Sequence, residues 1–205
     1  MRTIMLATDL SPRAHHALER AVALASDNRA ALVIVHVVDE DLPGGIAEEH
    51  RRLAVEVIEE RLAAVPGAVG IDYGVHVLVG RVSGEILRLA EASRAELIVL
   101  GTHRAEPVTD FFRGATAERL IRTGKLPILV TARLVRGPYR RVIVGVDFSV
   151  CSRRAVECAA ALLPDAELFL VHAYEVPFRG FLYGRETAEA VAEEHERQLT
   201  AMIND

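Results

Sequence analysis

Three features of this 205-residue chain predict an α/β protein with a five-stranded open parallel sheet and helices on both faces. Short apolar runs alternate with longer segments in which apolar residues recur every three or four positions. Several runs are apolar throughout, which is typical of strands buried on both faces of a parallel sheet. The pattern then begins again near residue 141, so part of the fold is repeated.

The first half of the chain supplies the whole five-stranded sheet. After the first strand ends at Asp9, Ser11 and Pro12 are suited to the N-cap and first position of a helix. The third strand alternates apolar and polar residues, so it is expected near an edge of the sheet. The predicted strands are 3–8, 31–38, 72–79, 97–100 and 127–131, and the later helices are 46–65, 84–93 and 114–124.

The segment after the fourth strand has the outline of a phosphate site. The chain leaves the strand at Gly101, crosses polar residues, and resumes helical spacing at Gly114. Glycine lets a backbone come close to a ligand, and the free N–H groups of a helix start attract an anion. A plain strand-to-helix connection explains the same residues equally well.

Composition and charge exclude several classes of function. The formal net charge is −5 and the arginines form scattered pairs, which argues against a nucleic-acid-binding surface. The longest apolar runs fall far short of the ~20 residues of a membrane span, and Asp9 comes too early for a signal peptide, so we expect a cytoplasmic protein that does not bind membranes. Cys151 and Cys158 lie ~10 Å apart along a predicted helix, which excludes a disulfide, and both are expected to be buried.

The repeat covers residues 141–205 and is incomplete. Asp147 matches Asp9, and His172 matches His36, which we interpret as a core histidine with its hydrogen bonds satisfied. The copy has two strands and two helices but lacks three strands and the glycine loop. Because a two-stranded fragment is marginal alone and strand 127–131 is another candidate edge, we expect a homodimer or a larger assembly.

With the repeat, the aspartate strand ends and the glycine loop in view, the chain resembles the universal stress protein family. It is similar to a tandem-type member with a complete domain at 1–133, a linker at 134–140 and a truncated second copy at 141–205. The resemblance implies an adenine-nucleotide alpha hydrolase-like fold and ATP binding through G-x2-G-x9-G-[ST] after the fourth strand. The spacing from Gly101 to Gly114 is kept, but Arg104 replaces the second glycine and Ala115 the hydroxyl residue.

The resemblance also implies a role for individual residues. Asp9 matches the aspartate that contacts adenosine, and Val37 the position whose backbone pairs with the adenine edge. Thr116 is a substitute source for the missing hydroxyl, and the Arg104 guanidinium can contact phosphate directly. The nucleotide-binding residues expected on this basis are Asp9, Val37, Gly101, Thr102, His103, Arg104, Gly114, Ala115 and Thr116.

Three functional hypotheses remain open. The first is a cytoplasmic stress-response protein that binds ATP, with or without Mg²⁺, or a related adenine nucleotide in its first domain and acts through an unknown protein partner. The second is a nucleotide-free dimerisation or scaffold protein in which Arg104 and Ala115 record a lost site. The third is an ATPase or nucleotidyl-transfer enzyme. No general base or Walker-type lysine accompanies the loop, so we expect no catalytic residues, no metal site and slow hydrolysis at most.

Overall fold

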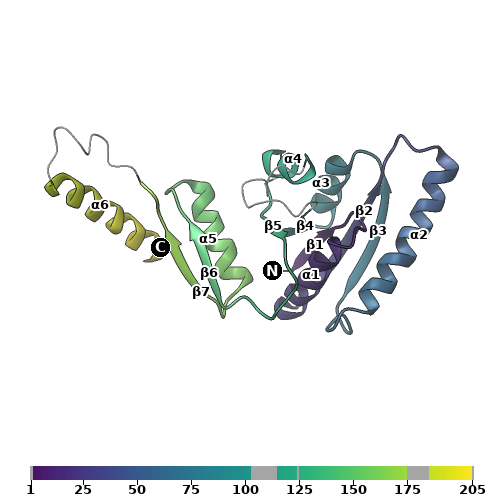
Figure 1. Ribbon diagram of the computed structural model, residues 1–205, viewed down its shortest axis with the longest axis horizontal. Coiled ribbons are helices and arrows are strands. Elements are labelled where there is room, and N and C mark those ends of the chain that lie inside the picture. The colour runs from purple at the N-terminus through teal and green to yellow at the C-terminus, as the bar shows by residue number, and fades with distance from the viewer. Residues whose placement is uncertain (1, 103–114, 124, 175–184, 205) are drawn as a thin grey trace. The chain divides into compact units, whose positions relative to one another are not determined.

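The computed structural model describes residues 2–102, 115–123, 125–174 and 185–204. They form two compact units, Met1–Pro138 and Tyr139–Asp205, and each is described by itself (Figure 1).

The first unit contains a five-stranded, fully parallel sheet in the order β3-β2-β1-β4-β5. β1 lies at the centre, with β2 on one side and β4 on the other. The chain therefore builds one side of the sheet first and crosses β1 to build the other, which makes the gap between β1 and β4 the topological switch point. The strands are β1 Thr3–Ala7, β2 Ala31–Val38, β3 Tyr73–Val79, β4 Leu97–Gly101 and β5 Ile128–Thr131.

Helices cover both faces of this sheet. On one face, Leu6 and Ile34 line a small cavity together with Leu18 of α1 and Ile58 of α2. On the other face, Met5, Val35 and Ile98 form a buried cluster with residues of α3 and α4. The predicted fold class is therefore confirmed. The helices are α1 Ala14–Asn28, α2 Gly44–Ala63, α3 Val82–Ala92 and α4 Ala115–Thr123.

The second unit contains a two-stranded parallel sheet, with Ile143 of β6 in register with Phe169 of β7. Val144 and Val146 are buried beside Met202 of α6 and pack against Val156 of α5. The described elements are β6 Arg141–Gly145, α5 Val150–Leu162, β7 Glu167–Val171 and α6 Arg185–Asn204.

Two local expectations are corrected and two are confirmed. α1 begins at Ala14 rather than Pro12, because the Ala14 N–H donates to the Ser11 carbonyl in a tight turn that precedes the helix. Cys151 is exposed and Cys158 only half-buried, although both are free thiols as expected. The third and fifth strands lie at the two edges of the sheet, as predicted.

Candidate functional site

The turn that carries Asp9 lies at the carboxyl end of β1. Leu10 has the left-handed φ of 59°, which turns the chain from the strand toward α1. The Ser11 N–H donates to Asp9 Oδ1 at 2.9 Å, and the Ala14 N–H donates to Ser11 Oγ at 3.3 Å. Asp9 is exposed, and its carboxylate helps to hold the turn that precedes α1.

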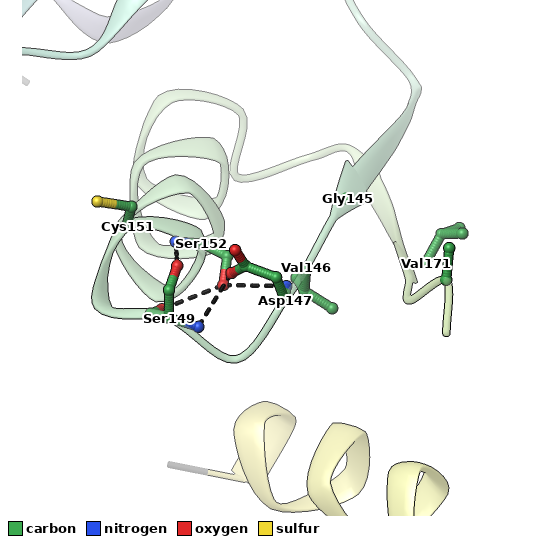
Figure 2. Close-up of a pocket in the computed structure, with 8 residues that line it drawn as sticks. Gly145, Val146, Asp147, Ser149, Cys151, Ser152 and Val171 are labelled. Atoms are coloured by element: carbon green, nitrogen blue, oxygen red, sulfur yellow. Dashed lines mark hydrogen bonds between the residues drawn. The ribbon is translucent and has the colours of Figure 1, made fainter. Parts of the chain in front are cut away.

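The second unit builds the same turn from the matching residues. Phe148 has a φ of 61°, Asp147 Oδ1 accepts the Ser149 N–H at 3.0 Å, and Ser149 Oγ accepts the Ser152 N–H at 3.2 Å (Figure 2). Hydrogen bonds from Ser149, followed by that from the Ser152 hydroxyl, lower the pKa of Asp147 from 3.8 to about 2. Hydrogen bonds to a carboxylate favour its charged form. Asp147 therefore helps to hold this turn as a charged acceptor, which is a structural role.

A histidine ties the second strand of each copy to the end of the first. Nδ1 of His36 lies 2.9 Å from the Thr8 carbonyl oxygen, and Nδ1 of His172 lies 2.7 Å from that of Val146. The carbonyl can only accept, so Nδ1 carries the proton in both rings. The interpretation of His36 as a satisfied structural histidine is confirmed, although its side chain is half-buried rather than fully enclosed. Val37, the next residue, is also half-buried.

Gly101 lies at the carboxyl end of β4, where the strand meets the start of α1. A Cβ atom at this position would come within 3.2 Å of the Ala14 Cα and 3.5 Å of the Arg13 carbonyl oxygen. The close approach of strand and helix therefore favours glycine here, whether or not a ligand binds nearby. Thr102 continues the sheet by donating its N–H to the Thr131 carbonyl at 3.1 Å.

The remaining predicted site residues belong to the loop and to the start of α4. Thr116 lies in the first turn of α4 and is half-buried, and Ala115 is the first residue of that helix. His103, Arg104 and Gly114 lie outside the described residues, so their part in the site stays a prediction.

The sequence analysis missed one residue that supports the site. Arg61, on the last turn of α2, donates from Nη1 to the Leu10 carbonyl at 2.9 Å. It therefore holds the turn after β1 from a helix 51 residues away in sequence. Local sequence patterns carry no signal for such a contact, because an arginine near a helix C-terminus is common for electrostatic reasons.

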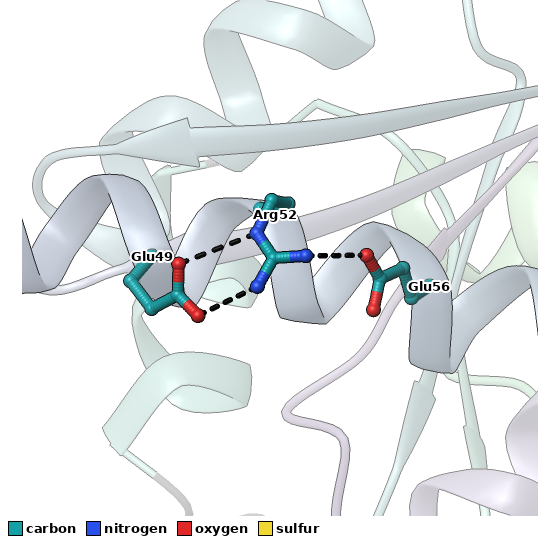
Figure 3. Close-up of polar contacts among 3 residues, drawn as sticks. All are labelled: Glu49, Arg52 and Glu56. Carbon is teal, nitrogen blue, oxygen red and sulfur yellow. Dashed lines mark hydrogen bonds and ion pairs between the residues drawn. The ribbon is translucent and has the colours of Figure 1, made fainter.

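The charged face of α2 carries a small network of exposed ion pairs. Arg52 forms ion pairs with Glu49 at 2.7 Å and with Glu56 at 2.9 Å, and all three side chains are more than half exposed (Figure 3). Arg52 lowers the pKa of Glu49, mainly through the side-chain hydrogen bond. Over the described ranges, histidine, cysteine and carboxylate side chains form no group of three or more that could hold a metal ion.

The geometry defines a class of protein: an open parallel α/β fold with polar residues at the strand carboxyl ends, followed by a repeat of its opening elements. The chain belongs to the universal stress protein family, whose model matches residues 1–132 and again 138–203. No described helix has both the length and the apolar composition that crossing a membrane requires.

Known relatives match the first unit or both. A universal stress protein of Thermus aquaticus is 30% identical over 133 residues, which are 63% of this chain and 97% of the relative. A universal stress protein structure from Archaeoglobus fulgidus has a TM-score of 0.70 at 23% identity, covering 94% of this chain and 73% of that one. A universal stress protein solved in complex with cAMP has a TM-score of 0.52 at 20% identity, covering 63% and 96%.

Proposed function

We propose that the first unit binds an adenine nucleotide at the carboxyl ends of β1, β2 and β4, and that the protein acts in a cytoplasmic stress response through a protein partner. The observation that carries the proposal is the switch point between β1 and β4, where Ala7 and Leu100 are neighbours in register just before Asp9 and Gly101. Ligands of open α/β sheets bind in the crevice outside the strand carboxyl ends at this point. The complex of a family member with cAMP supports an adenine ligand.

In this proposal the two ends of the nucleotide are held by different elements. Asp9 and the backbone of Val37 receive the adenosine. Asp9 follows β1, which borders the switch point, and Val37 lies near the carboxyl end of β2, which pairs with β1. The phosphates lie against the loop from Gly101 and the first turn of α4, where unpaired N–H groups and the helix dipole favour an anion. ATP, with Mg²⁺ on its phosphates, is the ligand we favour, and we expect slow hydrolysis at most.

A nucleotide-free scaffold is the second candidate, and one observation favours it. Asp9 and Asp147 accept the N–H of matching serines in the same turn, although the described part of the second copy contains no counterpart of the loop after Gly101. An aspartate kept for the turn would persist in a chain that had lost its ligand. In that case the protein would function by assembling with other chains, and the edge strand β5 is one place where another chain could pair with the sheet.

A thermal-shift titration separates these two functions. Ligand at a hundredfold excess over its dissociation constant stabilises the bound fold by about 2.7 kcal/mol, or roughly 5–10 °C in Tm for a unit of this size. We expect Mg-ATP to produce such a shift and Gly114→Asp, which places a carboxylate against the phosphates, to abolish it. A shift of the same size in Gly114→Asp would refute the phosphate position, and no shift with any adenine nucleotide would favour the scaffold.

A further inference from the structure

The peptide group between Leu10 and Ser11 links a remote arginine to the Asp9 carboxylate. Its carbonyl oxygen accepts a hydrogen bond from Arg61 Nη1 at 2.9 Å, and its N–H donates to Asp9 Oδ1 at 2.9 Å. A peptide group is planar, and its C=O and N–H point in opposite directions, so fixing one end fixes the direction of the other. The position of the Asp9 carboxylate is therefore set in part from α2.

Leu10 adopts a backbone conformation that needs support. Its φ of 59° lies in the left-handed region, which is unfavourable for leucine because the Cβ atom is crowded there. A residue keeps such a conformation only where surrounding contacts hold it. The Leu10 N–H donates to Thr8 Oγ1 at 3.1 Å, a contact between near neighbours in sequence, whereas the bond to its carbonyl comes from a separate helix. Arg61 therefore ties this residue to the body of the first unit.

The Arg61 side chain is packed against the turn that it holds. Its Nη1 also donates to the Ser11 carbonyl at 3.4 Å, so the same nitrogen reaches two successive residues of the turn. Arg61, Leu10 and Ile58 of α2 line a cavity of about 10 Å³. A space of this size is about what one water molecule needs. The half-buried arginine is thus enclosed beside the turn, and its contact does not depend on a freely moving surface side chain.

The second unit supports the matching residue in a different way. Phe148 has a φ of 61°, and its ring centroid lies 4.4 Å from that of His172 and 6.0 Å from that of His195 on α6. In both units, therefore, a residue of the helix after the second strand contacts the residue that follows the aspartate. In the first unit this contact is a hydrogen bond from a cation to the backbone, so it acts directly on the peptide group that binds the aspartate.

We propose that Arg61 is a positioning residue of the adenine-nucleotide site and acts on the ligand through Asp9. Its guanidinium fixes and polarises the peptide group whose N–H binds Asp9 Oδ1, because hydrogen bonds in such a chain strengthen one another. The carboxylate is thereby held in place before the adenosine binds, which reduces the ordering that binding requires. This role rests on the proposed function and extends the site to α2, a helix that carries none of the residues assigned to the ligand.

Calorimetry of the full chain with Mg-ATP and with adenosine tests this role in a double-mutant cycle. Arg61→Met keeps an apolar stem but removes the donor. We expect it to weaken both ligands by the same factor, about tenfold, because the phosphate contacts are untouched. In the Asp9→Ala chain, which lacks the carboxylate, Arg61→Met is expected to change the affinity by less than about twofold.

Arg51→Met is the matched control. Arg51 also lies on α2 and also donates to a backbone carbonyl, from Nε to Val77 of β3 at 3.2 Å, but β2 separates β3 from β1. The affinity of this variant for both ligands is expected to stay within about twofold of the wild-type chain. Hydrogen exchange adds a readout without ligand, since the Ser11 amide is expected to exchange faster in Arg61→Met than in the wild type or in Arg51→Met.

The wild-type titration separates the two ways in which this inference can fail. If the wild-type chain binds Mg-ATP, the role of Arg61 alone is overturned by an unchanged affinity of Arg61→Met, by losses that add in full to those of Asp9→Ala, or by an equal loss in Arg51→Met. Unchanged exchange of the Ser11 amide in Arg61→Met would also overturn it. If the wild-type chain binds neither Mg-ATP nor adenosine, the proposed function fails and the role of Arg61 fails with it.

Discussion

Gly101→Ala tests the claim that this glycine exists for the contact between β4 and α1. The added Cβ would lie 3.2 Å from the Ala14 Cα and 3.5 Å from the Ala14 nitrogen, so backbone and not a flexible side chain has to move. Overpacking of this kind costs about 1–3 kcal/mol, partly offset by about 0.4–1 kcal/mol from the lower entropy of the unfolded chain. We expect a net loss of roughly 1–2 kcal/mol, or about 3–6 °C in Tm for the first unit.

Gly145→Ala is the matched control. Gly145 also ends a strand of the repeat, but a Cβ there meets nothing within 4 Å. That variant is expected to be neutral or slightly stabilising. Urea unfolding followed by circular dichroism, with hydrogen exchange to assign the transition to one unit, measures both variants. If Gly101→Ala is as stable as Gly145→Ala but loses nucleotide, the glycine serves the ligand, and our account of the helix contact is refuted.

Further predictions concern the core, the cap and the aspartates. Ile98→Ala is expected to cost about 2–5 kcal/mol in urea unfolding, since Ile98 is fully buried, whereas Ile121→Ala, at a site 45% exposed, is expected to cost under about 1 kcal/mol. Ser149→Ala removes the side-chain hydrogen bond that contributes most to lowering the pKa of Asp147, so an NMR titration is expected to show this pKa rise from about 2 toward 3.8. The pKa of Asp147 is lower in the folded protein (about 2) than the ordinary value of 3.8 expected in the unfolded chain. Its contribution to the free energy of unfolding is therefore present above pH 3.8 and is lost as the pH falls toward 2. Ser149→Ala is expected to make the free energy of unfolding depend less on pH in this range.

The strands of the first unit could be predicted from sequence because a strand that is buried on both faces has an unbroken run of apolar residues. Leu97 to Leu100 is apolar at every position, and all four side chains are buried. The same logic placed β3 at an edge, since its alternating residues match a partly exposed strand. Helix starts were less accurate because Ser11 and Pro12 suit both an N-cap and the tight turn that the chain adopts before Ala14.

The exposure of the second unit could not be predicted from its own residues. α5 has the spacing of a buried helix, and Cys151 was expected inside because the two cysteines were interpreted as small buried apolar side chains. Burial depends on which other elements are present, and Ile143 has the same apolar character as Met5 despite its 74% exposure. The contact of Arg61 with Leu10 was missed for a related reason, since it joins residues far apart in sequence.

Isothermal titration calorimetry of the full chain with Mg-ATP tests the central proposal most directly. The account predicts one site per chain, weakened by Asp9→Ala and unchanged by Asp147→Ala, because the described second unit repeats the aspartate turn without the loop and helix start to which we assign the phosphates. Two sites per chain, or equal losses in the two aspartate variants, would contradict it, and the absence of any binding would leave the scaffold function in its place.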